Sequence, residues 1–102
     1  MESVFNEEIH APVRLRICGL LAHASRDFAE IRDALKLADS VISKHISRLE
    51  RAGYVTIEKV LDSRRVRTRI SLTETGFQAF ESHVAALREI ILPPPQGAVI
   101  PE

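Results

Sequence analysis

Apolar residues recur at intervals of three and four positions in several stretches of this chain, the spacing that places them on one face of an α-helix. The first stretch predicts a helix over about residues 12–23, with Pro12 in its first turn, where a missing backbone N–H costs nothing. A shorter helix or turn is expected before it, around residues 3–9. A second, two-turn helix follows, with Ser25 as its N-cap and a buried stripe of Phe28, Ile31 and Leu35.

A third helix is predicted after a short break at residues 37–40. Gly53 is expected to end it, because glycine readily adopts a positive φ. Period-two alternation then predicts two strands, over residues 54–60 and 66–72, which the charged turn 61–65 joins into a hairpin. The inner face of the third helix is expected to carry Ile42, Ile46 and Leu49.

The last predicted helix begins after Thr73 as N-cap and ends before the prolines at 93–95. The order helix, helix, short turn, helix, hairpin, helix is the plan of a winged helix-turn-helix. This is a mainly α fold with a three-helix core, a two-stranded wing and a C-terminal helix. We expect one domain over residues 1–92 and a proline-rich tail over 93–102. The apolar stripe of the last helix comprises Phe77, Phe80, Val84, Leu87 and Ile91.

Charge is distributed unevenly, although the formal net charge is zero. Residues 40–70 carry eight basic and three acidic side chains, a balance of +5, whereas residues 1–39 and 71–102 have balances of −2 and −3. Contacts to phosphate are local, so it is the local excess that matters for a nucleic-acid partner. The basic segment covers the third helix and the hairpin.

The outward face of the third helix suits the edges of base pairs. Small side chains let a helix approach the floor of the major groove, serine can donate or accept at either base, and valine can contact a thymine methyl. The alternative interpretation is a helix face that is merely solvated. If the predicted inner face is buried, the outward residues are Ser40, Val41, Ser43, Lys44, Ser47 and Arg48.

Four arginines fall within six positions of the hairpin: Arg64, Arg65, Arg67 and Arg69. Arg67 and Arg69 are expected on the outward face of the returning strand, with only Asp62 nearby. Such a cluster repels itself unless it meets an anion, and guanidinium groups bind phosphate or enter a narrow minor groove. The alternative is an edge strand that its charge protects from aggregation.

Three segments carry a family resemblance: PVRLRICGLL, FAEIRDALKLADSVISKHISRLERAGYV and EKVLDSRRVRTRISLTETG. Together they resemble the MarR/ArsR-like winged-helix regulators of bacteria over residues 9–92. The resemblance implies a transcription factor with Ser43, Lys44 and Arg48 on its recognition helix, its wing arginines on DNA, and dimerisation through the terminal helices. Ala38 departs from the family pattern, because a threonine or serine cap is common there. Asp39 or Ser40 is therefore expected to cap the recognition helix.

The stripe of the last helix is also relevant to assembly. Phe77 and Phe80 are expected to pack on the domain's own core, whereas Val84, Leu87 and Ile91 are expected to extend beyond it and form a dimer interface. A two-fold dimer would place two recognition helices ~34 Å apart and would require a near-palindromic operator.

Other chemistry is expected to be absent. Cys18 is interpreted as a small buried hydrophobe rather than a redox sensor, because no neighbouring cation is evident. The histidines show no close pair in the sequence, so we expect no metal site, and His45 is interpreted as a packing or hydrogen-bonding residue rather than a base reader. Without a phosphate loop or a nucleophile–base pair, we expect neither a cofactor nor an enzyme.

These observations predict a protein that binds double-stranded DNA sequence-specifically and regulates transcription. Its recognition helix, about residues 39–52, would enter the major groove, and its wing, residues 60–69, would contact phosphates or the minor groove. The alternative is a protein-interaction module whose basic wing docks an acidic partner. No apolar run approaches the ~20 residues that span a bilayer, the N-terminus lacks a signal-peptide core, and one cysteine fits a reducing cytoplasm, so a cytoplasmic protein is expected. A small-molecule effector is left open.

Overall fold

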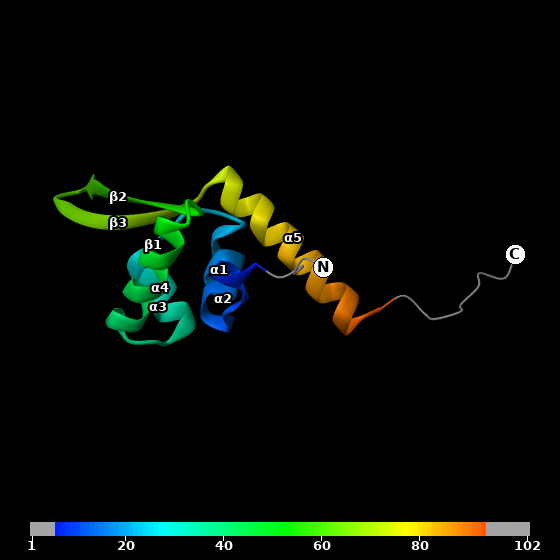
Figure 1. Ribbon diagram of the computed structural model, residues 1–102. Coiled ribbons are helices and arrows are strands. Elements are labelled where there is room, and N and C mark those ends of the chain that lie inside the picture. The colour runs from blue at the N-terminus through cyan, green and yellow to red at the C-terminus, as the bar shows by residue number, and fades with distance from the viewer. Residues whose placement is uncertain (1–5, 94–102) are drawn as a thin grey trace, which may run out of the picture.

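The computed structural model describes residues 6–93 and shows a helical domain with a small sheet and a long hairpin (Figure 1). The winged-helix plan is confirmed, and the sheet has three strands rather than two. The tail expected from residue 93 onward lies, apart from Pro93, outside the described residues. In chain order the elements are α1 (Glu7–His10), α2 (Pro12–Leu21), β1 (Arg26–Asp27), α3 (Phe28–Leu35), α4 (Asp39–Arg51), β2 (Val55–Asp62), β3 (Arg65–Leu72) and α5 (Glu74–Ile91).

The core forms where the apolar stripes of the helices meet the base of the sheet. Every helix from α1 to α4 contributes buried aliphatic residues, and Val55 and Ile70 contribute from β2 and β3. The stripes predicted from helical spacing in α3 and α4 are buried or half-buried as expected. The fully or nearly fully buried apolar residues are Ile9, Ile17, Cys18, Leu21, Ile31, Leu35, Ile42, Ile46, Leu49, Val55 and Ile70.

Two expected helix caps are wrong. Helix α3 begins after Asp27 rather than Ser25, because Asp27 and Glu30 form a capping box in which the Asp27 N–H donates to the Glu30 carboxylate at 2.8 Å. Helix α4 begins after Ala38, which has no capping side chain. The Ala38 carbonyl accepts the N–H groups of Val41 and Ile42, and Asp39 places a negative charge in the first turn, where the helix dipole favours it.

The end of α4 and the start of α5 are fixed by one group of backbone contacts. Gly53 has φ +82°, and the N–H groups of Gly53 and Tyr54 donate back to Glu50 and Leu49, which closes α4 as the sequence predicts. The Thr73 hydroxyl accepts the Gly76 N–H at 2.9 Å and donates to the Gly53 carbonyl at 2.8 Å. Thr73 thereby ties the start of α5 to the end of α4.

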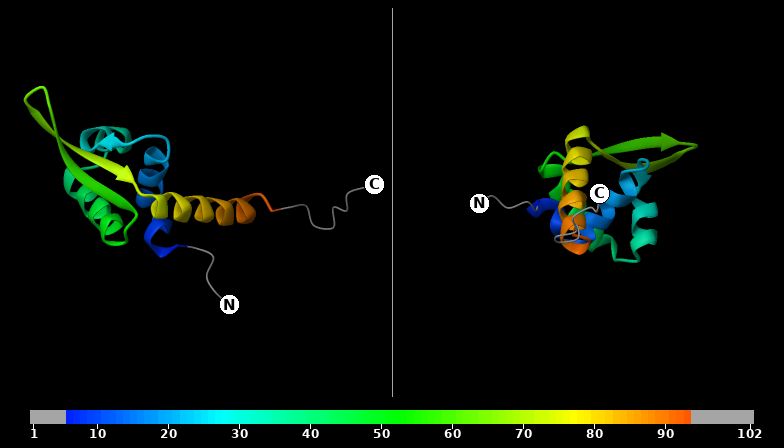
Figure 2. Two further views of the ribbon diagram at one scale, coloured as in Figure 1. Left: turned by 90° about the horizontal axis from the view of Figure 1, so that it is seen from above. Right: turned by 90° about the vertical axis from the view of Figure 1, so that its right-hand side faces the viewer.

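The sheet has the strand order β1-β3-β2, with both pairs antiparallel. Strands β2 and β3 pair over eight positions from Val55↔Leu72 to Asp62↔Arg65, so the hairpin extends well past the core (Figure 2). Its turn consists of Ser63 and Arg64, both with positive φ (50° and 72°), the backbone of a tight two-residue turn.

Helix α5 points away from the hairpin. Its first turns lie against the domain, and its C-terminal half projects past α1 and α2 at the end of the molecule opposite to the hairpin (Figures 1 and 2). Phe80 packs against the core as expected, but Phe77 is 38% exposed, so the expectation that both phenylalanines would be buried is only half right. Within residues 6–93, none of the helices has the length and apolar character needed to cross a membrane.

Candidate nucleic-acid interface

Helix α4 presents a polar outer face along its 13 residues. All six residues predicted to face outward are exposed, and Val41 is the only apolar one among them. The face exists because Ile42, Ile46 and Leu49 hold the opposite side in the core. Lys44, Arg48 and Arg51 add a basic row at i, i+4 and i+7, which continues to the C-terminal end of the helix.

Arg48 is not free, because Glu8 of α1 holds it. The Arg48 Nε donates to a Glu8 carboxylate oxygen at 2.8 Å, and the two side chains are 48% and 34% exposed. The hydrogen bond from Arg48 lowers the pKa of Glu8, and the positive charges of Arg48, Arg14 and Arg51 act in the same direction. Glu8, Arg48, Arg51 and Ala52 line a shallow hollow at this end of α4.

The tip of the hairpin carries two exposed arginines. Arg64 occupies the turn and Arg65 opens β3, and among the residues that the structure describes neither makes an ion pair. Beside them Leu61 and Val66 face each other across the strands and are 73% and 65% exposed. The tip is therefore cationic with an apolar pair behind it.

Arg67 differs from what the sequence led us to expect. Instead of lying free on the outward face, it is half-buried and pairs with two carboxylates, Asp62 at 2.7 Å and Asp27 at 3.3 Å. Asp27 is the N-cap of α3, so its pair with Arg67 connects the hairpin to the start of that helix. The Asp27 side chain is only 18% exposed, so the pair is partly shielded from solvent. Arg69 is half-buried and faces Glu58 and Asp27 in the strand register. The two ends of the arginine cluster are thus in different environments.

A buried arginine supports α4 from inside. Arg14 of α2 is 7% exposed and donates to the backbone carbonyls of Glu7 and Glu8 in the first turn of α1. Its third contact is with Nδ1 of His45, at 3.1 Å, which must accept because guanidinium only donates. Burial lowers the pKa of His45, and the charges of Arg14, Lys44 and Arg48 reinforce this. His45 thus makes the hydrogen bond expected of it and points away from the outer face.

The structure also pairs two histidines that are far apart in the sequence. His83 of α5 is 1% exposed; its Nδ1 accepts the Asn6 N–H at 3.2 Å, and its Nε2 lies 3.2 Å from Nδ1 of His10. Burial lowers the pKa of His83, as does the charge of His10. Among the described residues, no group of three or more His, Cys, Asp or Glu side chains is placed to hold a metal ion. Burial raises the pKa of the Cys18 thiol to about 11. The expectation of no neighbouring cation is wrong, because the charge of Arg14 acts to lower this pKa, but burial outweighs it and Cys18 packs in the core.

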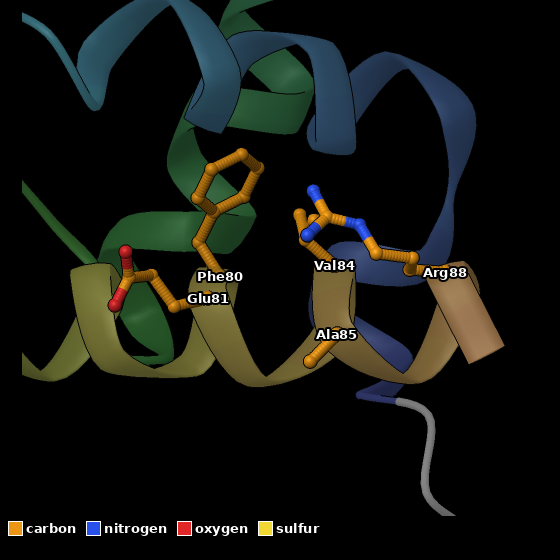
Figure 3. A pocket seen from close by; sticks show the side chains of 5 residues that line it. All are labelled: Phe80, Glu81, Val84, Ala85 and Arg88. Atoms are coloured by element: carbon orange, nitrogen blue, oxygen red, sulfur yellow. The ribbon is translucent and has the colours of Figure 1, made fainter. Parts of the chain in front are cut away.

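The predicted dimer stripe lies on the projecting half of α5. Val84 and Leu87 are half-buried and Ile91 is 69% exposed, and together with Arg88 and Leu92 they line an apolar hollow. Figure 3 shows Phe80, Val84 and Arg88 on the side of α5 that faces the other helices, whereas Ala85 points away. The apolar hollow therefore begins at Val84, one helical turn after Phe80, which packs against the core.

Sequence reasoning missed two residues at this interface. Arg51 could have been found, because it continues the spacing of Lys44 and Arg48 along one helix face. Glu8 could not, since it lies 40 positions from its partner and no periodic pattern links the two.

Residues 13–91 match the family described as "Winged helix DNA-binding domain". A transcriptional regulator homologue from Pyrococcus horikoshii has a similar structure, with a TM-score of 0.80 and 30% identity over 84% of this chain and 86% of that one. An uncharacterized protein of Methanocaldococcus jannaschii is 29% identical over 79 residues, which cover 76% of this chain and 86% of that protein.

A structure assigned to the MarR family of transcriptional regulators, from Enterococcus faecalis, shares the fold with a TM-score of 0.73 at 18% identity, covering 80% of this chain and 74% of the other. The winged-helix resemblance drawn from the sequence is confirmed by the family match over residues 13–91 and by the regulator homologue from Pyrococcus horikoshii, while the expected bacterial origin stays a prediction. The chain belongs to the family of winged helix DNA-binding domains.

Proposed function

We propose that this protein regulates transcription by binding duplex DNA sequence-specifically, with α4 in the major groove and the hairpin tip on the neighbouring phosphates or minor groove. The observation that carries the proposal is the combination of an exposed polar face on α4 with two arginines at the hairpin tip that make no ion pair among residues 6–93. Both elements lie at the end of the molecule opposite to the free half of α5 (Figure 1).

The dimensions and chemistry of α4 support this placement. A helix of 13 residues is ~20 Å long, and the major groove is ~12 Å wide, enough to admit it. Ser40, Ser43 and Ser47 are small and exposed, so the backbone can approach the base edges closely. Because Asp39 is the first helical residue, Ser40 and Val41 lie in the first turn, the part of a recognition helix that contacts bases.

We further propose a homodimer held together by the projecting half of α5, through Val84, Leu87 and Ile91. An apolar hollow on a helix that extends beyond its own core leaves surface that a second copy can cover. Two-fold pairing would present two α4 helices to a near-palindromic site. Such a regulator acts where the DNA lies, which in a prokaryote is the cytoplasm.

Titration of labelled duplex DNA at several salt concentrations tests the DNA-binding function. Binding to phosphates predicts that the logarithm of the association constant falls linearly with the logarithm of salt concentration, by ~0.9 per neutralised phosphate. An Arg64→Ala, Arg65→Ala double variant should lose about two such units. If the wild-type protein fails to bind duplex DNA even at low salt, DNA binding is refuted, and the basic tip is better explained as a docking site for an acidic protein.

A further inference from the structure

The ion pair between Glu8 and Arg48 removes a cation from the surface that would face DNA. Arg48 lies on the exposed side of α4, four positions after Lys44, yet its guanidinium already donates to a carboxylate at 2.8 Å. A carboxylate and a phosphate offer similar bidentate acceptors to guanidinium. Glu8 therefore occupies the place on Arg48 that a DNA phosphate would take.

Glu8 is held firmly in this position by the rest of α1. The Asn6 side chain accepts the N–H groups of Glu8 and Ile9, and Ile9 is fully buried in the core. The buried Arg14 donates to the Glu8 carbonyl. Most exposed ion pairs are weak because two flexible side chains must be ordered. Here the backbone that carries one partner is already fixed, so less conformational entropy is lost when the pair forms.

We propose that Glu8 is a determinant of DNA selectivity because it holds Arg48 in an internal ion pair. Random duplex DNA does not break this pair, whereas formation of a specific complex does. This rests on the proposed DNA-binding function. In loose complexes with random DNA, Arg48 is neutralised internally and releases no counterion. In a complex where α4 sits fully in the groove, a phosphate replaces the Glu8 carboxylate. The adjacent Arg51, which lines the same hollow, stays available in both cases.

A second explanation of the pair is purely structural. Arg48 and Arg51 lie in the last turn of α4, where cations are favoured by the helix dipole, and Glu8 would then simply fasten α1 to α4. The two explanations differ in what happens when the carboxylate is neutralised. A fastener predicts lower stability and unchanged or weaker DNA binding, whereas a competitor predicts stronger binding to random DNA.

The test is the salt dependence of binding to a random-sequence duplex about two helical turns long. Glu8→Gln should steepen the slope of log K against log salt by ~0.9, because Arg48 then neutralises a phosphate. Glu7→Gln is the matched control: Glu7 is exposed on the same helix and its charge also acts on Arg48, but its carboxylate does not hold the guanidinium. It should leave the slope unchanged.

Arg48→Ala completes the experiment in both backgrounds. In the wild-type background it should not alter the slope, and in the Glu8→Gln background it should reduce the slope by ~0.9. Thermal unfolding of each variant checks that the fold is kept, and Arg48→Ala in the wild-type background remains informative if Glu8→Gln does not fold. Equal slopes for Glu8→Gln and Glu7→Gln, or a slope already reduced by Arg48→Ala alone, would overturn the inference while leaving DNA binding intact. Wild-type protein that does not bind the duplex would overturn both.

Discussion

Replacing Arg65 and Arg67 by alanine, one at a time, compares two arginines that lie two positions apart on the same strand. Arg65 is exposed and makes no ion pair within the described part of the chain, whereas Arg67 is held by Asp62 and Asp27. From composition alone the two are equivalent. The structure predicts that, of these two arginines, Arg65 alone contributes to the attraction of DNA.

The magnitude follows from counterion release. A free arginine that neutralises one phosphate contributes ~0.9 to the slope of log K against log salt. When salt rises from about 50 to 200 mM, the fold-loss of affinity should therefore be roughly 3.5 times smaller for Arg65→Ala than for the wild type. Arg67→Ala should change the slope by close to zero, because its charge is already shared by two carboxylates. Titration of a labelled duplex by fluorescence anisotropy at four or more salt concentrations measures both slopes.

Stability should respond in the opposite order. Arg67 connects the hairpin to Asp27 at the start of α3, and losing such a partly exposed pair costs up to ~1 kcal/mol. For a domain of this size that lowers Tm by about 4–8 °C, whereas Arg65→Ala should leave Tm nearly unchanged. If Arg67→Ala reduces the salt slope as much as Arg65→Ala does, the reasoning from ion pairs is refuted, and Arg67 must leave its carboxylates when DNA binds.

Three further predictions concern assembly, packing and pH. Leu87→Glu should convert dimers to monomers in sedimentation velocity, whereas Ser82→Glu, at an exposed position of the same helix outside the apolar stripe, should not. An assembly state that Leu87→Glu leaves unchanged would exclude this interface. Gly76→Ala should lower the free energy of unfolding by about 1–3 kcal/mol, because the added Cβ would lie 2.2 Å from the Tyr54 carbonyl oxygen; destabilisation by less than the error of a denaturant titration would contradict it. Burial lowers the pKa of His83 in the folded protein, so on acidification the unfolded chain takes up the proton first; the free energy of unfolding should therefore fall as pH drops below about 6.5 and level off above it. His83→Asn should flatten this pH dependence in urea titrations. A pH profile identical to that of the wild type would show that His83 does not titrate on unfolding.

Most of the fold could be predicted from the sequence because its elements are strongly periodic. Ile42, Ile46 and Leu49 define the buried side of α4, and this also fixes which residues are exposed. The start of α4 was less predictable, since Ala38 carries no capping side chain and only the backbone conformation distinguishes it from Asp39. Strand β1 has two residues, too few for alternation to indicate anything.

The candidate site was predicted less completely than the fold, and the difference has a physical cause. Exposure follows from helical and strand periods, so the outer residues of α4 were found. Ion pairs cannot be predicted from these periods, because the two partners come from different elements. Glu8 lies 40 positions from Arg48, and Asp27 reaches Arg67 only because β1 pairs with β3. The charge excess of residues 40–70 therefore overstated the number of cations available to DNA.

Internal pairing of cations is consistent with what a selective DNA-binding protein requires. A genome offers ~10⁶–10⁹ non-specific sites, so each cation that binds any phosphate strengthens the competitors as well as the target. Arg48 and Arg67 are both neutralised by carboxylates within the domain, whereas Arg64 and Arg65 at the hairpin tip have no carboxylate partner among the residues that the structure describes. The tip can then attract the duplex from a distance, while the paired arginine on α4 responds only when the helix is seated in the groove. The neutral net charge of the chain at first argues against a polyanionic partner, but Glu8, Asp27 and Asp62 are among the acidic residues that balance it, and they lie where they restrain the cations.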